Sequence, residues 1–130
     1  MSKFLPRNYE EIEPTILEPS ESHRYIEEIL DFADNSNEGV SEVVAALEEM
    51  AKRLSDQYKI FNKNESKRIL SYIQKTWKDA NVDQKEGMGS LLYGLEDRSL
   101  AISFLEGELN IEDRDEVLSI INDVLSELRE

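Results

Sequence analysis

After Pro19, apolar side chains recur at intervals of three and four residues along nearly the whole chain. This spacing gathers them on one face of a helix, and no segment shows the two-residue alternation that is typical of a strand. The pattern predicts an all-α fold of five to six antiparallel helices. We expect residues 20–130 to form a single helical domain, preceded by an extended arm, residues 1–19, that contains all three prolines.

The boundaries of the helices follow from polar residues that favour helix starts and turns. Within residues 80–98, three glycines at positions 87, 89 and 94 weaken a helical pattern, and we interpret them as sites of close helix approach. The other expected helices span 22–34, 41–62, 64–79, 99–109 and 113 to the C-terminus. The expected caps are Ser20 or Ser22, Ser41, Asn64, and Asp113 with Glu116 in a capping-box spacing.

A faint internal repeat leaves two architectures open. Residues 21–29 align with residues 65–73 at an offset of 44, and residues 117–121 align with the second copy at an offset of 48. A period of about 40–47 residues with paired helices is the size of a HEAT-like unit. The helices therefore form either a compact bundle or a short HEAT-like stack of helical hairpins.

The sequence contains no complete catalytic, cofactor-binding or metal-binding motif. The absence of cysteine excludes disulfides, iron–sulfur clusters and cysteine-ligated zinc. His23, the only histidine, has no nucleophile motif near it and is expected to be solvated. The segment 34–39 resembles a calcium loop, but Ala45 stands where an EF-hand needs a bidentate glutamate. With no phosphate loop, dinucleotide fingerprint or Glu-x-x-His motif either, we interpret the chain as a non-enzyme without cofactor or metal.

The charge of −14 is distributed in three blocks: −10 over residues 1–49, +6 over 50–78 and −10 over 79–130. This balance disfavours nucleic acid and anionic membranes as partners and favours one basic protein. No apolar stretch has the length of a signal peptide or a membrane span, so we expect a cytoplasmic protein.

The basic block has two interpretations. Its lysines and arginines alternate with aromatic residues, a mixture that can bind nucleic acid. The alternative, which we favour, is that these cations satisfy the acidic helices beside them. Tyr72 and Trp77 are then expected to be partly buried.

The acidic clusters are the remaining candidates for a binding surface. If the chain folds back on itself, the clusters of the first and last helices are expected to form one surface. Clustered carboxylates of this kind accelerate association with a cationic site. The candidate partner-binding residues are Glu106, Glu108, Glu112, Asp113, Asp115, Glu116, Asp123, Glu27 and Asp31.

In its composition and helical layout over residues 20–130, the chain resembles the immunity proteins of bacterial toxin systems, including colicin-type and contact-dependent growth inhibition systems. The resemblance implies a stoichiometric inhibitor, monomeric when free or in a 1:1 complex, whose acidic face covers the basic cleft of a nuclease toxin. Two alternatives remain: a helical adaptor that binds a peptide or subunit in an apolar groove, and an acidic DNA mimic.

Overall fold

The structure is a computed structural model that describes residues 19–35, 39–53 and 61–129. The predicted arm lies outside these residues except for Pro19, with which the first helix begins. Every element within the described ranges is helical, which confirms the all-α prediction. The elements are α1 (Pro19–Asn35), α2 (Val40–Arg53), α3 (Lys63–Thr76), the short 3-10 helix η2 (Trp77–Asp79), α4 (Val82–Leu92), α5 (Arg98–Ile111) and α6 (Asp115–Leu128).

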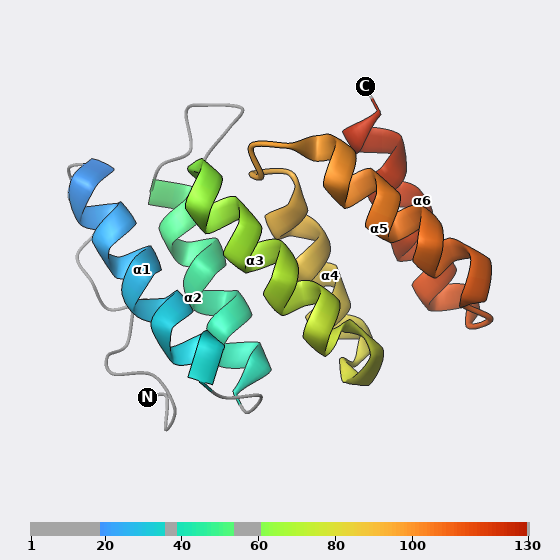
Figure 1. Cartoon of the computed structure of the whole chain (residues 1–130). Coiled ribbons are helices and arrows are strands. Elements are labelled where there is room, and N and C mark those ends of the chain that lie inside the picture. The colour runs from blue at the N-terminus through green and yellow to red at the C-terminus, as the bar shows by residue number, and fades with distance from the viewer. Residues whose placement is uncertain (1–18, 36–38, 54–60, 130) are drawn as a thin grey trace.

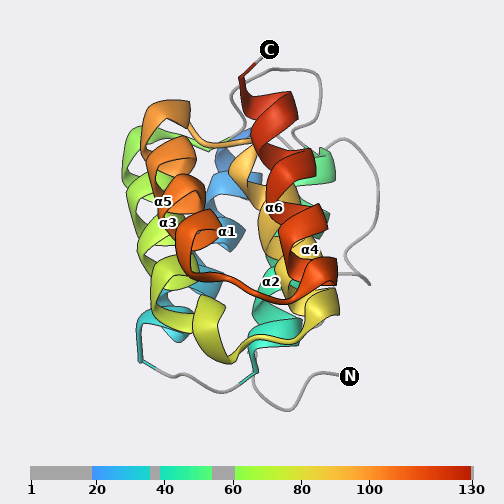
Figure 2. The ribbon, with the colours of Figure 1, turned by 90° about the vertical axis from the view of Figure 1, so that its right-hand side faces the viewer.

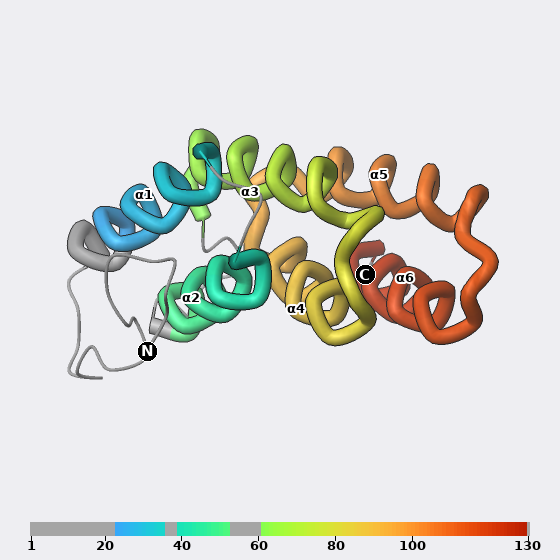
Figure 3. Tube along the Cα trace, turned by 90° about the horizontal axis from the view of Figure 1, so that it is seen from below, coloured from blue at the N-terminus to red at the C-terminus, as the bar shows by residue number. Residues whose placement is uncertain are grey.

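The six α-helices run alternately up and down and form three hairpins placed side by side (Figure 1). Viewed from below, α1, α3 and α5 form one layer, and α2, α4 and α6 form the other (Figure 3). The same two layers are seen from the α5–α6 end in Figure 2. Of the two architectures left open by the sequence, the molecule therefore adopts the short stack of helical hairpins.

The internal repeat is real for its first two copies only. Helices α1 and α3 begin 44 residues apart, at Pro19 and Lys63, and occupy equivalent places in the same layer. The third alignment is wrong, because residues 117–121 belong to α6 in the opposite layer. Amphipathic helices have the same apolar spacing wherever they lie in a fold. The spacing alone therefore aligned residues 117–121 of α6 with α3, although the two helices lie in different layers.

The core lies between the two layers and continues through all three hairpins. Tyr72 and Trp77 are buried, as expected. The Trp77 ring meets the Phe104 ring edge-on with centroids 5.7 Å apart, which links the second hairpin to the third. Among the side chains fully buried in the core are Ile26, Ile29, Leu30, Leu47, Met50, Ile69, Ile73, Met88, Leu105, Val117 and Ile121.

Two glycines of α4 allow close helix approach, as the sequence suggested. A Cβ atom built at Gly87 would lie 2.6 Å from Cγ1 of Val44 in α2. A Cβ atom at Gly89 would lie 2.8 Å from Cγ2 of Val124 in α6. Helix α4 therefore packs so closely against its two neighbours of the same layer that a Cβ at either position would force Val44 or Val124 to shift.

The cap of α3 differs from the prediction. Asn62, rather than Asn64, is the N-cap: its side chain accepts a hydrogen bond from the backbone N–H of Glu65 at 2.8 Å. The Glu65 carboxylate in turn accepts from the backbone N–H of Asn62 at 3.0 Å, which completes a capping box. Only Asn62 has a glutamate three residues later, so the spacing would have identified it. The second predicted helix therefore cannot extend to residue 62.

Three further caps are also corrected. Ser20 and Ser22 lie inside α1, because the helix already begins at Pro19, a residue well suited to a first helical position. Ser41 lies inside α2, which follows Gly39 at a φ of 69°, and its hydroxyl accepts a hydrogen bond from Gln84. Asp113 lies before the N-cap of α6, which is Arg114. The extended backbone at Glu112 and Arg114 delays the helix start by one residue, so Glu116 misses the capping-box position.

Candidate protein-binding surface

The structure divides the nine candidate residues between two helical hairpins. Glu27 and Asp31 lie on α1, and the other seven lie on α5, on α6 or on the loop that joins them. Helix α1 stands at one end of the stack and the α5–α6 hairpin at the other (Figures 1 and 3). The expectation that both clusters form one surface is therefore wrong. The intervening α3–α4 hairpin separates them.

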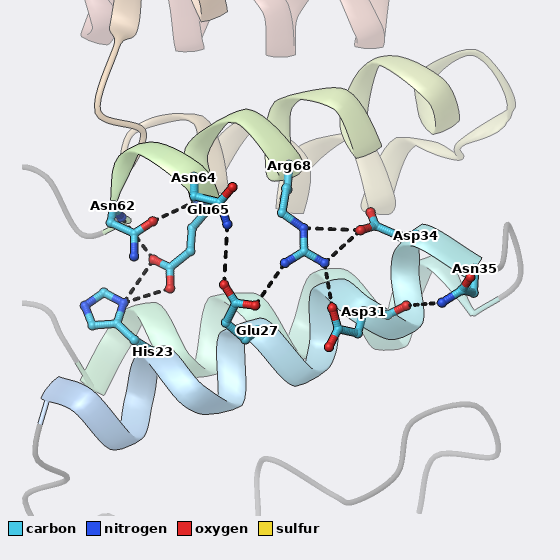
Figure 4. A network of polar contacts seen from close by, with 9 residues as sticks. All are labelled: His23, Glu27, Asp31, Asp34, Asn35, Asn62, Asn64, Glu65 and Arg68. Atoms are coloured by element: carbon cyan, nitrogen blue, oxygen red, sulfur yellow. Dashed lines mark hydrogen bonds and ion pairs between the residues drawn. The ribbon is translucent and has the colours of Figure 1, made fainter.

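The carboxylates of α1 are neutralised from within the fold by Arg68 of α3 (Figure 4). Its guanidinium lies 3.1 Å from a Glu27 oxygen, 2.9 Å from Asp31 and 2.7 Å from Asp34. Hydrogen bonds and attraction to these carboxylates outweigh partial burial and raise the pKa of Arg68. This contact supports the view that cations of the basic block satisfy their acidic neighbours. It also binds α1 to α3.

A second polar contact between α1 and α3 involves His23, which the sequence suggested would be solvated. That interpretation is wrong: the side chain is 32% exposed, and Nδ1 lies 2.9 Å from each carboxylate oxygen of Glu65. The Glu65 side chain is completely buried, and it also accepts from the Asn62 backbone (Figure 4). Since an ionised carboxylate only accepts hydrogen bonds, His23 Nδ1 is the donor. His23 and Asn62 thus provide the partners that a buried carboxylate requires.

We define the acidic α5–α6 surface as Glu106, Glu108, Glu112, Asp113, Asp115, Glu116 and Asp123. Two of its members have a cationic partner on the same hairpin. Arg114 Nε lies 2.8 Å from a Glu112 oxygen, and Arg129 lies 2.5 Å from Glu106. The Glu112 hydrogen bond and charge, with Asp113 and Glu116 nearby, raise the pKa of the exposed Arg114. Arg114 and Arg129 are therefore already bound to carboxylates.

The remaining exposed carboxylates of this surface carry uncompensated charge. Asp113, Asp115, Glu116 and Asp123 are exposed, and within the described ranges none of them forms an ion pair. Asp115 and Glu116 lie in the first turn of α6, where the partial positive charge of the helix terminus stabilises acidic residues. Residues 98–129 together contain eight acidic and three basic side chains, a net charge of −5. This end of the stack therefore projects a negative field.

Asp123 lies beside a shallow recess of about 180 Å³ at the α4–α6 seam, lined also by Tyr93 and Glu86. Burial, together with Glu127 and Asp123, raises the pKa of Tyr93 to about 12. The Tyr93 hydroxyl is hydrogen-bonded to the Glu127 side chain, so it joins the α4–α6 seam to the last helix.

Lys85 is a buried cation that no sequence motif identified. Only 1% of the residue is exposed; Nζ donates to the Ala80 carbonyl at 2.5 Å and lies 5.3 Å from the centre of the Trp77 ring. Burial and the charge of Arg114 lower its pKa, while Glu112 and Glu108 act in the opposite direction. Lys85 therefore anchors the turn before α4 beneath the acidic surface and is not available to a partner.

No protein family, curated protein or solved structure matches this chain significantly. Within the described residues, no group of three or more histidine and acidic side chains is placed to hold a metal ion. None of the described helices combines the length and apolar character that a membrane span needs.

Proposed function

We propose that this protein is a non-enzymatic, protein-binding inhibitor of the immunity type, which neutralises a basic, nuclease-type toxin domain with its acidic α5–α6 surface. A nuclease holds its substrate with cations that contact phosphates. A rigid surface of carboxylates placed over those cations would exclude the nucleic acid. The inhibitor would bind one partner domain in a 1:1 complex.

The observation that carries the proposal is the contrast between the two acidic ends. Glu27, Asp31 and Asp34 of α1 are already paired with Arg68, whereas Asp113, Asp115, Glu116 and Asp123 form no ion pair within the part of the chain that the structure describes. Uncompensated, exposed charge of one sign destabilises a compact protein slightly and accelerates encounter with an opposite charge. Of the candidate partner-binding residues, the α5–α6 group is therefore preferred over Glu27 and Asp31.

A capture experiment tests the proposal. The tagged protein is incubated at low salt with a lysate of its own source cells, eluted with a salt gradient and analysed by mass spectrometry. A parallel capture uses the double variant Asp115→Lys, Glu116→Lys. We expect one basic protein at 1:1 stoichiometry that elutes at moderate salt, is lost with the variant, and has a nuclease activity that the wild-type protein abolishes. A partner that the variant retains, or one without an activity that the protein inhibits, would refute the proposal.

A further inference from the structure

The described part of the chain leaves two large hydrophobic side chains exposed, and both lie on α5. Leu100 is 49% exposed and Ile111 is 76% exposed. Positions 100, 104, 107 and 111 repeat at intervals of three and four residues, so they share one face of the helix. Phe104 on this face is half-buried against Trp77, and a Cβ at Gly107 would have no atom within 4 Å. The face is therefore an apolar stripe that the fold covers only at Phe104.

The N-terminal end of this stripe borders a groove between α3 and α5. The groove has a volume of about 230 Å³, and Leu70, Leu95 and Leu100 form its apolar lining. Lys63 and Lys67 line its α3 side, and Glu96 and Asp97 line the side toward the start of α5. A ligand here would meet apolar side chains below, cations along α3 and carboxylates at one end.

Two lysines on the groove side of α3 have no charged partner in the described part of the chain. Lys63 and Lys67 are exposed, and neither forms an ion pair with any described residue. Lys78 in η2 is likewise exposed and unpaired within the described ranges. Their neighbour Arg68 points the other way, to the carboxylates of α1 (Figure 4). The basic block therefore has one side that satisfies α1 and another side that remains available.

We propose that this α3–α5 groove, with the apolar stripe of α5, is a second docking site, and that it binds an acidic amphipathic helix of a partner protein. In helix-in-groove binding, the ligand helix carries apolar anchors at intervals of three, four and seven residues. The apolar lining of the groove and the exposed Leu100 offer these anchors a surface to pack on. The free lysines specify carboxylates on the flank of the ligand that faces α3. The acidic end of the groove excludes carboxylates there, so the expected ligand is acidic on one flank only. A second copy of this chain is the less favourable occupant, because each copy carries a net charge of −14.

The groove is separate from the acidic α5–α6 surface, because it lies at the start of α5, and only Ile111 at the far end of the stripe adjoins Glu108 and Glu112 of that surface. It lies on the layer of α1, α3 and α5, and it attracts the opposite charge. The two proposals can therefore fail separately, provided that variants of Leu100 and Lys67 are compared with variants of Asp115 and Glu116.

Selection from a display library of 16-residue helical peptides tests the docking site. The full-length protein is the target, and peptides that also bind the variant Leu100→Ser, Ile111→Ser are removed. Both substituted side chains are exposed, so the variant is expected to fold like the wild type, which circular dichroism checks. We expect enriched peptides with apolar residues at three- and four-residue spacing and an excess of Asp and Glu on one flank.

Binding of the enriched peptides to single variants then locates the site. Lys67→Glu should weaken binding about tenfold, while Lys52→Glu, an exposed lysine on α2, should leave it unchanged. The proposal would be overturned if no peptides are enriched or if the enriched peptides lack an acidic flank. It would also be overturned if Lys52→Glu weakens peptide binding as much as Lys67→Glu does. A dimer that forms with rising concentration and is lost in the Leu100→Ser, Ile111→Ser variant would instead assign the groove to a second copy.

Discussion

The imidazole of His23 in α1 lies 2.9 Å from both carboxylate oxygens of Glu65 in α3, and the Glu65 side chain is completely buried. A carboxylate in this position destabilises the fold unless its oxygens are bonded. Asn62 provides one bond from its own helix, and His23 provides the bond from the neighbouring helix. The pair therefore fixes how α1 and α3 align.

Replacement of His23 by alanine should lower the free energy of unfolding by about 1 to 3 kcal/mol, because the buried carboxylate keeps only its backbone partner. His23→Asn retains an N–H donor near the position of Nδ1, so its free energy of unfolding should fall by less than that of His23→Ala. Urea denaturation of the three proteins measures the difference. Equal stabilities of wild type and His23→Ala would show that the Glu65 carboxylate does not depend on His23.

Arg68 joins three carboxylates of α1 with one guanidinium, and its side chain is only 19% exposed. Arg68→Met should destabilise the protein by about 1 to 2 kcal/mol, since exposed ion pairs each contribute little but this network also relieves repulsion among Glu27, Asp31 and Asp34. The adjacent Lys67→Met is the matched control and should change stability by less than about 0.5 kcal/mol.

Salt distinguishes the electrostatic contribution of Arg68 from simple packing. The loss of stability caused by Arg68→Met should be smaller when thermal unfolding is measured at high ionic strength, because screening weakens the ion pairs of the wild-type protein. A loss that is the same at low and high salt would mean that the alkyl chain of Arg68, rather than its charge, holds α1 to α3.

Gly89 and Gly107 are a matched pair of helical glycines. Alanine normally stabilises a helix by about 1 kcal/mol relative to glycine. At Gly107, where a Cβ meets nothing within 4 Å, Gly107→Ala should show this gain. At Gly89 the new Cβ would lie 2.8 Å from buried Val124, so Gly89→Ala should destabilise the protein by about 1 to 3 kcal/mol. If both substitutions raise the unfolding temperature, α4 and α6 do not approach as closely as the structure indicates.

Tyr72 carries a buried hydroxyl with no hydrogen-bond partner among the described residues, and burial with the nearby charge of Glu42 raises its pKa to about 12. An unfolded tyrosine loses its proton near pH 10. Between these values the folded state binds more protons than the unfolded state, so the free energy of unfolding should fall as pH rises from about 10 to 12. Tyr93, with its pKa also raised to about 12, adds to the fall.

The variant Tyr72→Phe tests this effect. At pH 7 it should be as stable as the wild type or more stable, because it removes an unpaired polar atom without changing the ring. Between pH 10 and 12 its stability should fall less steeply than that of the wild type, with the remainder due to Tyr93. Guanidinium denaturation at several pH values measures both the stability at pH 7 and its fall between pH 10 and 12. A Tyr72→Phe variant that is markedly less stable at pH 7 would reveal a hidden partner for the hydroxyl.

The sequence predicted those features that depend on local spacing. The apolar period identified the helices, and the glycines at 87 and 89 were correctly interpreted as sites of close packing. Capping was predicted less well, because several Asn, Ser and Asp residues compete near each helix start. The capping-box spacing identifies Asn62 at α3 but points wrongly to Asp113 at α6. Asn62 was the better choice than Asn64 for that reason.

What the sequence did not reveal depends on which helix faces which. Glu27, Asp31 and Asp34 are three and four residues apart, so one face of α1 was plainly acidic, but nothing local indicated that Arg68 of α3 would bind it. Glu65 and Lys85 look like ordinary surface residues in the sequence, yet both are buried. The separation of the two acidic clusters likewise follows from the order of the stacked hairpins.

The association rate with the captured basic protein shows whether the acidic α5–α6 surface binds the partner. Stopped-flow measurements compare wild type with the variant Asp115→Asn, Glu116→Gln. The control variant Asn35→Lys, Ser71→Lys changes the net charge by the same amount at exposed sites on α1 and α3.

We predict that the rate falls with rising salt, that the α6 variant associates about three- to tenfold more slowly at low salt, and that the control stays close to wild type. Equal rates for the two variants would contradict the account, because attraction would then come from the overall charge and not from this surface.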